Sequence, residues 1–312
     1  MPRRKSVDLV KRWEGNPIIT TPDLSFPVLD ICNAGAVKTE DGEYLLLIRI
    51  DHLEGRAQIH LARSRDGYRF EVDDEPVMKP ASKGPFEMYE TMGVEDPRIT
   101  RIDGEYYIVY TANSGLGVRL GLAKTKDFKS IKRVALISEP DTKHGALFPR
   151  KIKGRYLRLE RPAAGDSIWI SYSDDLVYWG SSEPVLTPRG GFWDFHRVGA
   201  AAPPIEIDEG WLISYHGVKS TSAGPLFKLG VAIADKEDPT QILARSNVPI
   251  LSPREPYERI GDVNNLVFST GAILEPDGQL KIYYGGSDSC ICVGTASVEE
   301  VVERCQEGVE EF

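Results

Sequence analysis

Residues 93–111 read GVEDPRITRIDGEYYIVYT, in which one strand-like run leads into a glycine turn and a second run follows. Pro97 biases the backbone around Asp96 away from helix and toward extended structure, so the stretch begins as a strand. Asp103-Gly104 predicts a hairpin turn, because the favoured turn needs positive φ and glycine adopts it cheaply. Taken alone, Asp96-Pro97-Arg98 could be a capped turn with a surface arginine. Its place in a repeat argues against that interpretation.

The same unit of strand, glycine turn and returning strand occurs five times along the chain. The five turns are Asp41-Gly42, Asp103-Gly104, Lys153-Gly154, Glu209-Gly210 and Asp277-Gly278. The returning strands are predicted at residues 44–49, 106–111, 156–161, 211–216 and 280–285. Third strands are predicted at residues 59–63, 120–124, 168–172, 229–233 and 291–295. A period of roughly fifty to seventy residues fits a multi-stranded blade and is too long for a helical pair.

This recurrence predicts an all-β fold, a five-bladed β-propeller that forms one domain over residues 1–312. A β-sandwich is the main alternative, but it would not require a fivefold recurrence of one unit. Only the chain ends look helical. Ser297 and Glu300 have the spacing of a capping box, which predicts a C-terminal helix over about residues 297–308. A second helical segment is expected at the N-terminus, over about residues 1–15.

Composition excludes several classes of partner. A net charge of −9 argues against nucleic acid, because phosphate backbones need a basic face. The first twelve residues have no apolar core run, so no secretory signal is expected, and no stretch is apolar enough to span a membrane. The four cysteines lack paired zinc spacing and are expected to be reduced structural thiols in a cytoplasmic protein. They are Cys32, Cys290, Cys292 and Cys305.

The sequence lacks the common signatures of metal or nucleotide chemistry. It has no phosphate-binding loop of the Walker type and no His-Glu-x-x-His motif. Gly115-Leu116-Gly117 lies between strands rather than before a helix, and no serine lies in a nucleophile-elbow pattern. We therefore expect neither a metal nor a cofactor.

The repeat gathers polar residues that are distant in sequence. In an up-and-down blade, first strands start and second strands end on one face, and the glycine turns lie on the other. This places the following residues on one rim: Asp96, Asp288, Arg49, Arg56, Arg150, Lys151 and His216. Singly, Lys151 could be an exposed strand lysine and His216 a core histidine, whereas Arg49 near the centre needs an anionic partner. Together they predict a site for a polyol and an anion, since arginine forks match phosphate oxygens.

Several short motifs resemble the β-mannoside phosphorylases of glycoside hydrolase family 130. They are VEDPR (94–98), LFPRKI (147–152), APPI (202–205), GW (210–211), YHG (215–217) and YYG (283–285) with Asp288. The resemblance runs from about Asn16 to the last repeat in the family's motif order. Singly none of these motifs is specific, but jointly they are.

The resemblance implies a five-bladed propeller and an inverting, reversible phosphorolysis of β-mannosides, including manno-oligosaccharides. The products would be α-mannose 1-phosphate and a shortened acceptor, with inorganic phosphate as co-substrate, so the enzyme would be a hexosyltransferase-type glycoside phosphorylase. Asp96 matches the family's catalytic carboxylate, a general acid whose proton reaches the glycosidic oxygen through the mannose 3-hydroxyl. Implied phosphate-binding residues are Arg56, Arg150, Lys151 and His216. Implied sugar-binding residues are Asn33, Arg49, Asp288 and Tyr283.

The chemistry of the nucleophile agrees with one carboxylate and several cations. An inverting hydrolase needs a second carboxylate to activate water, whereas phosphate is already an anionic nucleophile. Two alternatives stay open: a β-mannoside hydrolase of the same fold, whose family members lack these cations, and a non-catalytic carbohydrate-binding propeller. The linkage (β-1,2 or β-1,4), the acceptor, the chain length and the oligomeric state, monomer or homo-oligomer, also stay open.

Overall fold

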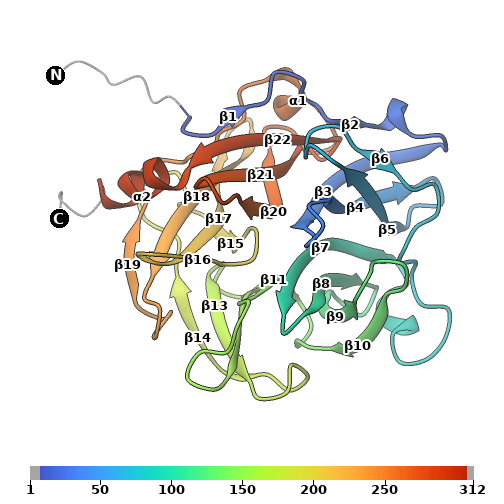
Figure 1. Cartoon of the computed structure of the whole chain (residues 1–312), viewed down its shortest axis with the longest axis horizontal. Coiled ribbons are helices and arrows are strands. Elements are labelled where there is room, and N and C mark those ends of the chain that lie inside the picture. Colours follow the sequence, from blue (N-terminus) through green and yellow to red (C-terminus); the bar gives the residue numbers. More distant parts are fainter. Residues whose placement is uncertain (1–7, 308–312) are drawn as a thin grey trace.

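The computed structural model describes residues 8–307 as a nearly all-β fold with two short α-helices (Figure 1). Within these residues the strands form four hydrogen-bonded sheets, which are arranged around a common centre (Figure 1). Two 3₁₀ turns, Thr21–Asp23 and Glu87–Tyr89, lie in the connections. The all-β prediction is confirmed.

The largest sheet contains two antiparallel meanders joined by one parallel pairing, between Ala57 and Gly93. The first meander consists of β3 (Val28–Lys38), β4 (Tyr44–His52), β5 (Ala57–Ser64) and β6 (Glu71–Val72). The second consists of β7 (Gly93–Ile102), β8 (Glu105–Asn113), β9 (Arg119–Thr125) and β10 (Lys132–Leu136).

Three further meanders form the other three sheets. One consists of β11 (Thr142–Leu147), β12 (Tyr156–Pro162), β13 (Ile168–Ser173) and β14 (Gly180–Leu186). The next consists of β15 (Arg197–Ala200), β16 (Ile205–Ile207), β17 (Gly210–Thr221), β18 (Gly224–Ala234) and β19 (Ile242–Arg245). The last consists of β20 (Val267–Leu274), β21 (Gln279–Gly286) and β22 (Cys290–Ser297), with β1 (Lys11–Arg12) and β2 (Ile19–Thr20) added at its edge.

The five predicted hairpins are present, each pairing the strand before its glycine turn antiparallel to the strand after it. The glycine of each turn has positive φ, as the turn chemistry requires. The predicted second and third strands all lie inside observed strands. The recurrence of one hairpin unit is therefore confirmed for the described part of the chain.

Of the two helices predicted at the chain ends, the C-terminal one is confirmed and the N-terminal one is not. The C-terminal helix is confirmed as α2 (Val298–Gln306), although its Ser297 makes no capping hydrogen bond. The N-terminal helix prediction is wrong over residues 8–15: Lys11–Arg12 form β1 and pair with β22, while residues 1–7 lie outside the described part. A second helix, α1 (Pro256–Arg259), lies inside the chain where none was predicted.

Apolar packing between meanders explains why the second strands are apolar on both faces. In β4, Leu45 and Leu47 pack into a cluster with the second meander, whereas Leu46 and Ile48 pack against the last meander. Alternate side chains of a strand point to opposite faces, so a strand between two sheets must be apolar throughout.

The inner strands approach one another so closely that side chains are excluded. A Cβ on Gly35 of β3 would lie 2.5 Å from the carbonyl oxygen of Pro97 in β7. A Cβ on Gly271 of β20 would lie 2.5 Å from the carbonyl oxygen of Ala34. β3 is thus held between β7 and β20, which fixes the polar side chains at the starts of these strands.

Candidate active site

Asp96 lies near the start of β7, at a bulge between Glu95 and Arg98 in the pairing with β8. Its φ is +50°, a left-handed conformation that a β-bulge can use to re-aim a side chain. The residue is only 6% exposed, and the Asn33 side-chain amide donates a 2.8 Å hydrogen bond to Asp96 Oδ1. Asn33 lies at a similar bulge of β3, also with φ +50°, so two strained positions meet at one carboxylate.

Arg49 provides the cation beside Asp96. It forms a bidentate pair with Asp51, with both N–O distances 2.9 Å, and its Nη1 lies 3.5 Å from both Glu95 and Asp96. Burial opposes ionisation of Asp96, but Arg49, Arg98 and then Lys143 oppose that effect and hold the pKa of Asp96 below its ordinary value. The ground state of the free site therefore holds Asp96 as a carboxylate.

Arg98 is a buried structural cation rather than the surface partner considered above. Its Nε donates to the carbonyl oxygen of Ala201 at 2.6 Å and its Nη2 to that of Ala200 at 3.0 Å. Its Nη1 donates to the carbonyl oxygen of Asp96 at 3.1 Å. Burial lowers the pKa of Arg98 to about 10, so it stays charged at neutral pH. Arg98 thereby ties the Asp96 backbone to the segment after β15.

Three more cations lie on β11, β12 and β15, strands that contact one another. Lys143 and Arg161 are register partners in β11 and β12, and Arg197 begins β15. Burial, followed by the positive charge of Arg197, lowers the pKa of Arg161, and Lys143 contributes to the field at Asp96. Arg161 has a 3.8 Å contact with the Asp166 carboxylate, whereas Lys143 and Arg197 form no ion pair within residues 8–307. Such under-compensated charge suits an anionic ligand.

His216 lies among these cations as a neutral imidazole. Its Nε2 accepts a 2.9 Å hydrogen bond from the backbone N–H of Ser269, so Nδ1 carries the proton. Burial and then the charge of Arg98 lower the pKa of His216 to about 3. The ring stacks on Phe268 at 3.8 Å between centroids, and its buried Nδ1 has no partner. His216 can therefore donate a hydrogen bond to an anion but adds no charge.

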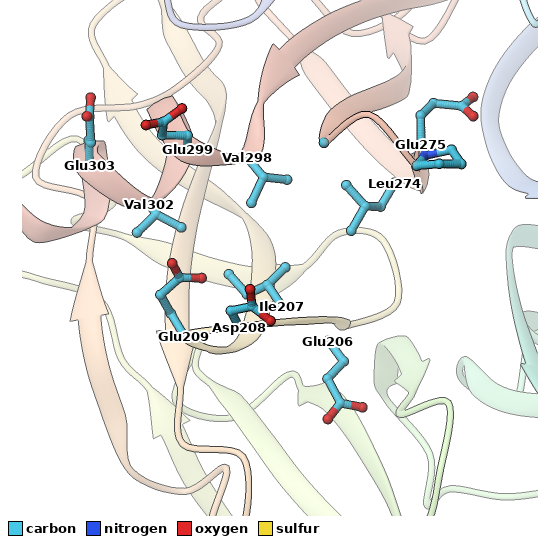
Figure 2. A pocket seen from close by; sticks show the side chains of 12 residues that line it. Glu206, Ile207, Asp208, Glu209, Leu274, Glu275, Val298, Glu299, Val302 and Glu303 are labelled. Atoms are coloured by element: carbon cyan, nitrogen blue, oxygen red, sulfur yellow. The ribbon is translucent and has the colours of Figure 1, made fainter.

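The structure corrects the predicted positions of Arg150 and Lys151. Arg150 forms a bidentate pair with Glu206 at 2.8 Å and covers the ring of Trp211, while Lys151 covers the ring of Tyr156. Figure 2 shows Glu206 beside the Asp208–Glu209 turn, among the residues that line a hollow at the glycine turns. Trp211 and His216 are five residues apart in β17, which corresponds to about 17 Å of strand.

The cause of this error is the place of β11. The predicted rim position of Arg150 and Lys151 requires the motif LFPRKI to begin the first strand of its unit, but β11 begins at Thr142 and the motif runs into the Gly154 turn. Lys143 and Arg197 were therefore missed, and Arg161, at the end of a predicted second strand, was not chosen as a site residue. The distance from the glycine turn was the available signal: Asp96 lies eight residues before Gly104, whereas Lys151 lies only three before Gly154.

Two further residues that were predicted to belong to the site, Tyr283 and Arg56, have other surroundings than the immediate neighbours of Asp96. Tyr283 is fully buried, and its hydroxyl donates a 3.0 Å hydrogen bond to the carbonyl oxygen of Gly67 in the β5–β6 turn. It is a core residue between the first and last meanders, so its prediction as a sugar ligand is wrong. Arg56 is exposed in the β4–β5 connection, and its side chain forms no hydrogen bond or ion pair among the described residues. Its predicted phosphate role stays a prediction.

Asp288 approaches Asp96 from the β21–β22 connection, as predicted. Its φ is +51° and its buried Oδ1 has no hydrogen-bond partner. Burial, followed by the negative charge of Asp96, raises the pKa of Asp288 to about 7. The structure thus brings Asn33, Arg49, His216 and Asp288 to Asp96, while their functional roles stay predictions.

Buried polar atoms without partners mark the same place. Such atoms are rare in folded proteins and call for an explanation. Around Asp96 they include Asn33 Oδ1, His144 Nδ1, Arg161 Nε, His216 Nδ1, Thr270 Oγ1 and Asp288 Oδ1. A sugar with several hydroxyl groups and an anion would satisfy them together.

A separate hollow lies on the glycine-turn face, with a volume of about 600 Å³ (Figure 2). Its lining combines apolar side chains with carboxylates and contains no cation, so it does not suit phosphate. Within residues 8–307 no group of three or more His, Cys, Asp and Glu residues could hold a metal ion. The described helices include none that is long and apolar enough to cross a membrane.

Comparison with known proteins gives a consistent result. The family described as beta-1,4-mannooligosaccharide phosphorylase, glycoside hydrolase family 130, matches residues 3–307. The beta-1,2-mannobiose phosphorylase of Listeria innocua is 36% identical over 259 residues, which cover 82% of this chain and 70% of the relative. The beta-1,4-mannooligosaccharide phosphorylase of Ruminococcus albus is 32% identical over 307 residues, which cover 95% and 90%.

Solved structures of family members are also similar to this chain. The beta-1,2-mannobiose phosphorylase from Listeria innocua, in complex with beta-1,2-mannobiose, has a TM-score of 0.87 to this chain at 31% identity. The similarity covers 96% of this chain and 99% of that one. A study of family hydrolases that target beta-1,2 mannosidic linkages in Candida mannan provides another structure, with a TM-score of 0.83 at 22% identity. At that identity the likeness concerns the fold alone, so the fold does not separate hydrolysis from phosphorolysis.

Proposed function

The chain belongs to glycoside hydrolase family 130, and from this premise we propose that it is a glycoside phosphorylase acting on β-mannosides. It transfers a mannosyl group from a manno-oligosaccharide to inorganic phosphate, with inversion. The products are α-mannose 1-phosphate and a shortened acceptor, and the reaction is reversible. The observation that carries the proposal is the group of three cations on contacting strands, Lys143, Arg161 and Arg197, of which Lys143 acts on the one buried carboxylate, Asp96.

The cations define where phosphate binds. Lys143 and Arg197 have no carboxylate partner within residues 8–307, and the Arg161 Nε is a buried donor without a partner. Arginine offers paired N–H donors to phosphate oxygens, and lysine adds a point charge. The neutral His216 adds its Nδ1–H. We assign these four residues as the phosphate site in place of Arg150 and Lys151.

Asp96 is then the general acid for the leaving oxygen. Its pKa is lowered in the free site, so phosphorolysis requires that ligand binding favour the protonated form. A phosphate dianion beside Lys143 offsets the field of that lysine at Asp96, which raises the pKa of that carboxyl. In the synthetic direction the carboxylate is already the required base. Asp96 is thus the acid in phosphorolysis and the base in synthesis. In phosphorolysis, phosphate binding favours the protonated form of Asp96.

Inversion follows from the placement of the two groups. Phosphate on the Lys143 side attacks the anomeric carbon from the face opposite to the bond that breaks. The proton from Asp96 goes to the glycosidic oxygen through the mannose 3-hydroxyl, as the family resemblance implies. No second carboxylate is needed, because phosphate requires no base to become a nucleophile.

We also assign the five meanders as the blades of a five-bladed propeller. Contacts between the inner strands of the first and last meanders, β3 and β20, support closure of the ring. A cytoplasmic location is supported by four buried free thiols in the described residues. A homo-oligomer remains part of the proposal to be tested by sedimentation, with neither nucleic acid nor membrane as partner.

Phosphate dependence tests the function. Incubation with β-1,2- and β-1,4-mannobiose should release mannose 1-phosphate only when phosphate is present. Equal sugar release without phosphate would identify a hydrolase and overturn the assignment of Lys143, Arg161 and Arg197. The reverse reaction, from mannose 1-phosphate and a panel of mannose, glucose and N-acetylglucosamine acceptors, then gives the linkage and the acceptor.

A further inference from the structure

His144 is a buried histidine beside the proposed phosphate site that has no partner in the protein. It follows Lys143 in β11, at the bulge between Lys143 and Ala146. The residue is 9% exposed and its Nδ1 is buried. No described residue forms a hydrogen bond with either nitrogen of its ring. Buried polar atoms of this kind call for an explanation.

The backbone of His144 repeats that of two residues already placed in the candidate site. Asn33 and Asp96 each lie at a bulge in the first strand of a meander, with φ +50°. His144 lies at the bulge of the next first strand, with φ +57°. Such left-handed positions are uncommon outside glycine, and a bulge re-aims the side chain that it carries. The third meander thus places His144 where the first two place Asn33 and Asp96.

The ring of His144 occupies space that Gly199 of β15 leaves open. A Cβ on Gly199 would clash with His144 Nδ1, so a side chain at position 199 would exclude the ring. Gly199 is the register partner of His216, and the two histidine rings meet edge to face at 5.9 Å between centroids. Phe268 meets His144 in the same way at 5.4 Å. The His144 ring is therefore held beside His216, a donor of the proposed phosphate site.

The charged groups that act on His144 are all cations. Burial, followed by the charges of Arg161 and Arg98, holds the pKa of the His144 ring well below its ordinary value. Lys143 adds to this effect, and no carboxylate among residues 8–307 pairs with the ring. A neutral imidazole has one N–H donor and one nitrogen acceptor. His144 thus brings a hydrogen-bond acceptor into a group of cations.

The four residues assigned to the phosphate site can only donate hydrogen bonds. Lysine and arginine side chains have no acceptor, and the Nε2 of His216 already accepts from the backbone N–H of Ser269. The dianion HPO₄²⁻ carries one O–H group, which needs an acceptor when it is buried. Sulfate has the same charge and a similar shape but no O–H. A single acceptor in this site would therefore distinguish the two anions.

Other acceptors near the site are engaged or lie elsewhere. Asp96 must itself hold a proton in phosphorolysis, and Glu95 accepts a 2.6 Å hydrogen bond from the Asn113 side chain. Asp288 is an implied sugar ligand, and none of the main charges that act on it is a cation of the phosphate site. Thr270 Oγ1 is a further buried atom without a partner, so the test includes it.

We propose that His144 accepts a hydrogen bond from the O–H group of bound HPO₄²⁻ and thereby selects phosphate against sulfate. The inference rests on the proposed function and names the residue that sets anion specificity at its phosphate site. Because neither ring nitrogen has a protein partner, the ring can adopt the tautomer that the anion requires. Sulfate would place an oxygen, rather than an O–H group, against the acceptor nitrogen, and that contact is unfavourable.

Two substitutions of His144 separate hydrogen bonding from packing. His144→Phe keeps a ring against Gly199 and His216 but has no acceptor. His144→Asn loses the ring but keeps an acceptor, and asparagine tolerates the left-handed backbone. Titration calorimetry with phosphate and with sulfate, at a pH where HPO₄²⁻ predominates, gives the two dissociation constants. The preference for phosphate should fall by roughly 10–100-fold in His144→Phe and stay closer to the wild-type value in His144→Asn.

Two control variants and one further anion complete the test. Thr270→Val removes the other unpartnered acceptor, and His60→Phe removes a fully buried imidazole of β5 outside the site; both should keep the wild-type preference. Monofluorophosphate is a dianion in which fluorine replaces the hydroxyl group. It should bind to the wild type as weakly as sulfate does, and this measurement does not depend on the folding of any variant.

The outcomes separate this inference from the proposed function. The inference would be overturned by an unchanged preference in His144→Phe, by its loss in Thr270→Val instead, or by a wild type that binds sulfate or monofluorophosphate as tightly as phosphate. A preference lost in His144→Asn but kept in His144→Phe would reduce His144 to a packing role. Each of these results leaves phosphorolysis intact, because release of mannose 1-phosphate is measured independently. A wild type that binds no phosphate would overturn both.

Discussion

Asp96 has a left-handed backbone conformation, and its carboxylate lies in the electric field of nearby cations. Replacement by asparagine keeps the shape and an acceptor for the Asn33 amide but removes the acid, so folding should be little affected. We expect Asp96→Asn to lower the rate of mannose 1-phosphate release by about 10²–10⁴-fold, the usual contribution of a general acid. Initial rates under saturating phosphate measure this. Glu95→Gln, which also changes a neighbour of Arg49, is the control, and an equal loss there would mean that Arg49 placement rather than proton donation had been disturbed.

Two lysines distinguish the phosphate site that we propose from the structure from the site predicted from the sequence. Lys143→Ala removes a cation that faces Asp96, so the KM for phosphate should rise by roughly 10–100-fold. Lys151→Ala removes an exposed lysine above Tyr156, and its KM should change by no more than about twofold. Steady-state kinetics with phosphate as the varied substrate measure both. A large effect of Lys151 with none of Lys143 would restore the sequence-based assignment.

Among the secondary structure elements, those whose determining residues are close together in the sequence could be predicted, and those that depend on a distant partner could not. The five hairpins were predictable because the glycine turn and its strands are neighbours in sequence. β1 was not, because residues 8–15 lack a partner until β22 is in place, and the pairing outweighs local helix preference. The start of β11 at Thr142 was hidden by the apolar LFPRKI motif, and with it the place of Lys143 was lost.

Glu258 of α1 fixes the N-terminal strand to this part of the fold. It is fully buried and accepts hydrogen bonds from Arg12 Nε at 2.7 Å, from Tyr284 and from the backbone of Arg254 and Glu255. Glu258→Gln removes the fully buried counterion of Arg12 and leaves that guanidinium only its 3.0 Å pair with Asp8 among the described residues, so the free energy of unfolding should fall by about 3 kcal/mol. Urea unfolding measures this. Glu307→Gln, in a surface pair with Arg304, should change it by less than about 1 kcal/mol; similar losses in both variants would show that Glu258 is no anchor.

At the level of the whole molecule, the proposed phosphate site joins parts that the backbone leaves in separate sheets. Asp96 lies in the sheet of the first two meanders, Lys143 and Arg161 in the next, and Arg197 with His216 in a third. Phosphate bound between them exists only when all three sheets are in place, so it should stabilise the folded state against global unfolding. At a concentration one hundred times Kd, the stabilisation should be about 2.7 kcal/mol.

Thermal unfolding with added phosphate measures this linkage, with chloride at equal ionic strength as the control. The midpoint should rise with phosphate in the wild type and in Lys151→Ala, and should rise far less in Lys143→Ala. Screening should weaken the effect at high salt, although less than for an exposed pair, because the site is largely buried. If chloride raised the midpoint as much as phosphate, the cations would attract anions in general and would not form a specific phosphate site. A rise that Lys143→Ala fully retains would place the phosphate elsewhere in the molecule, away from Asp96.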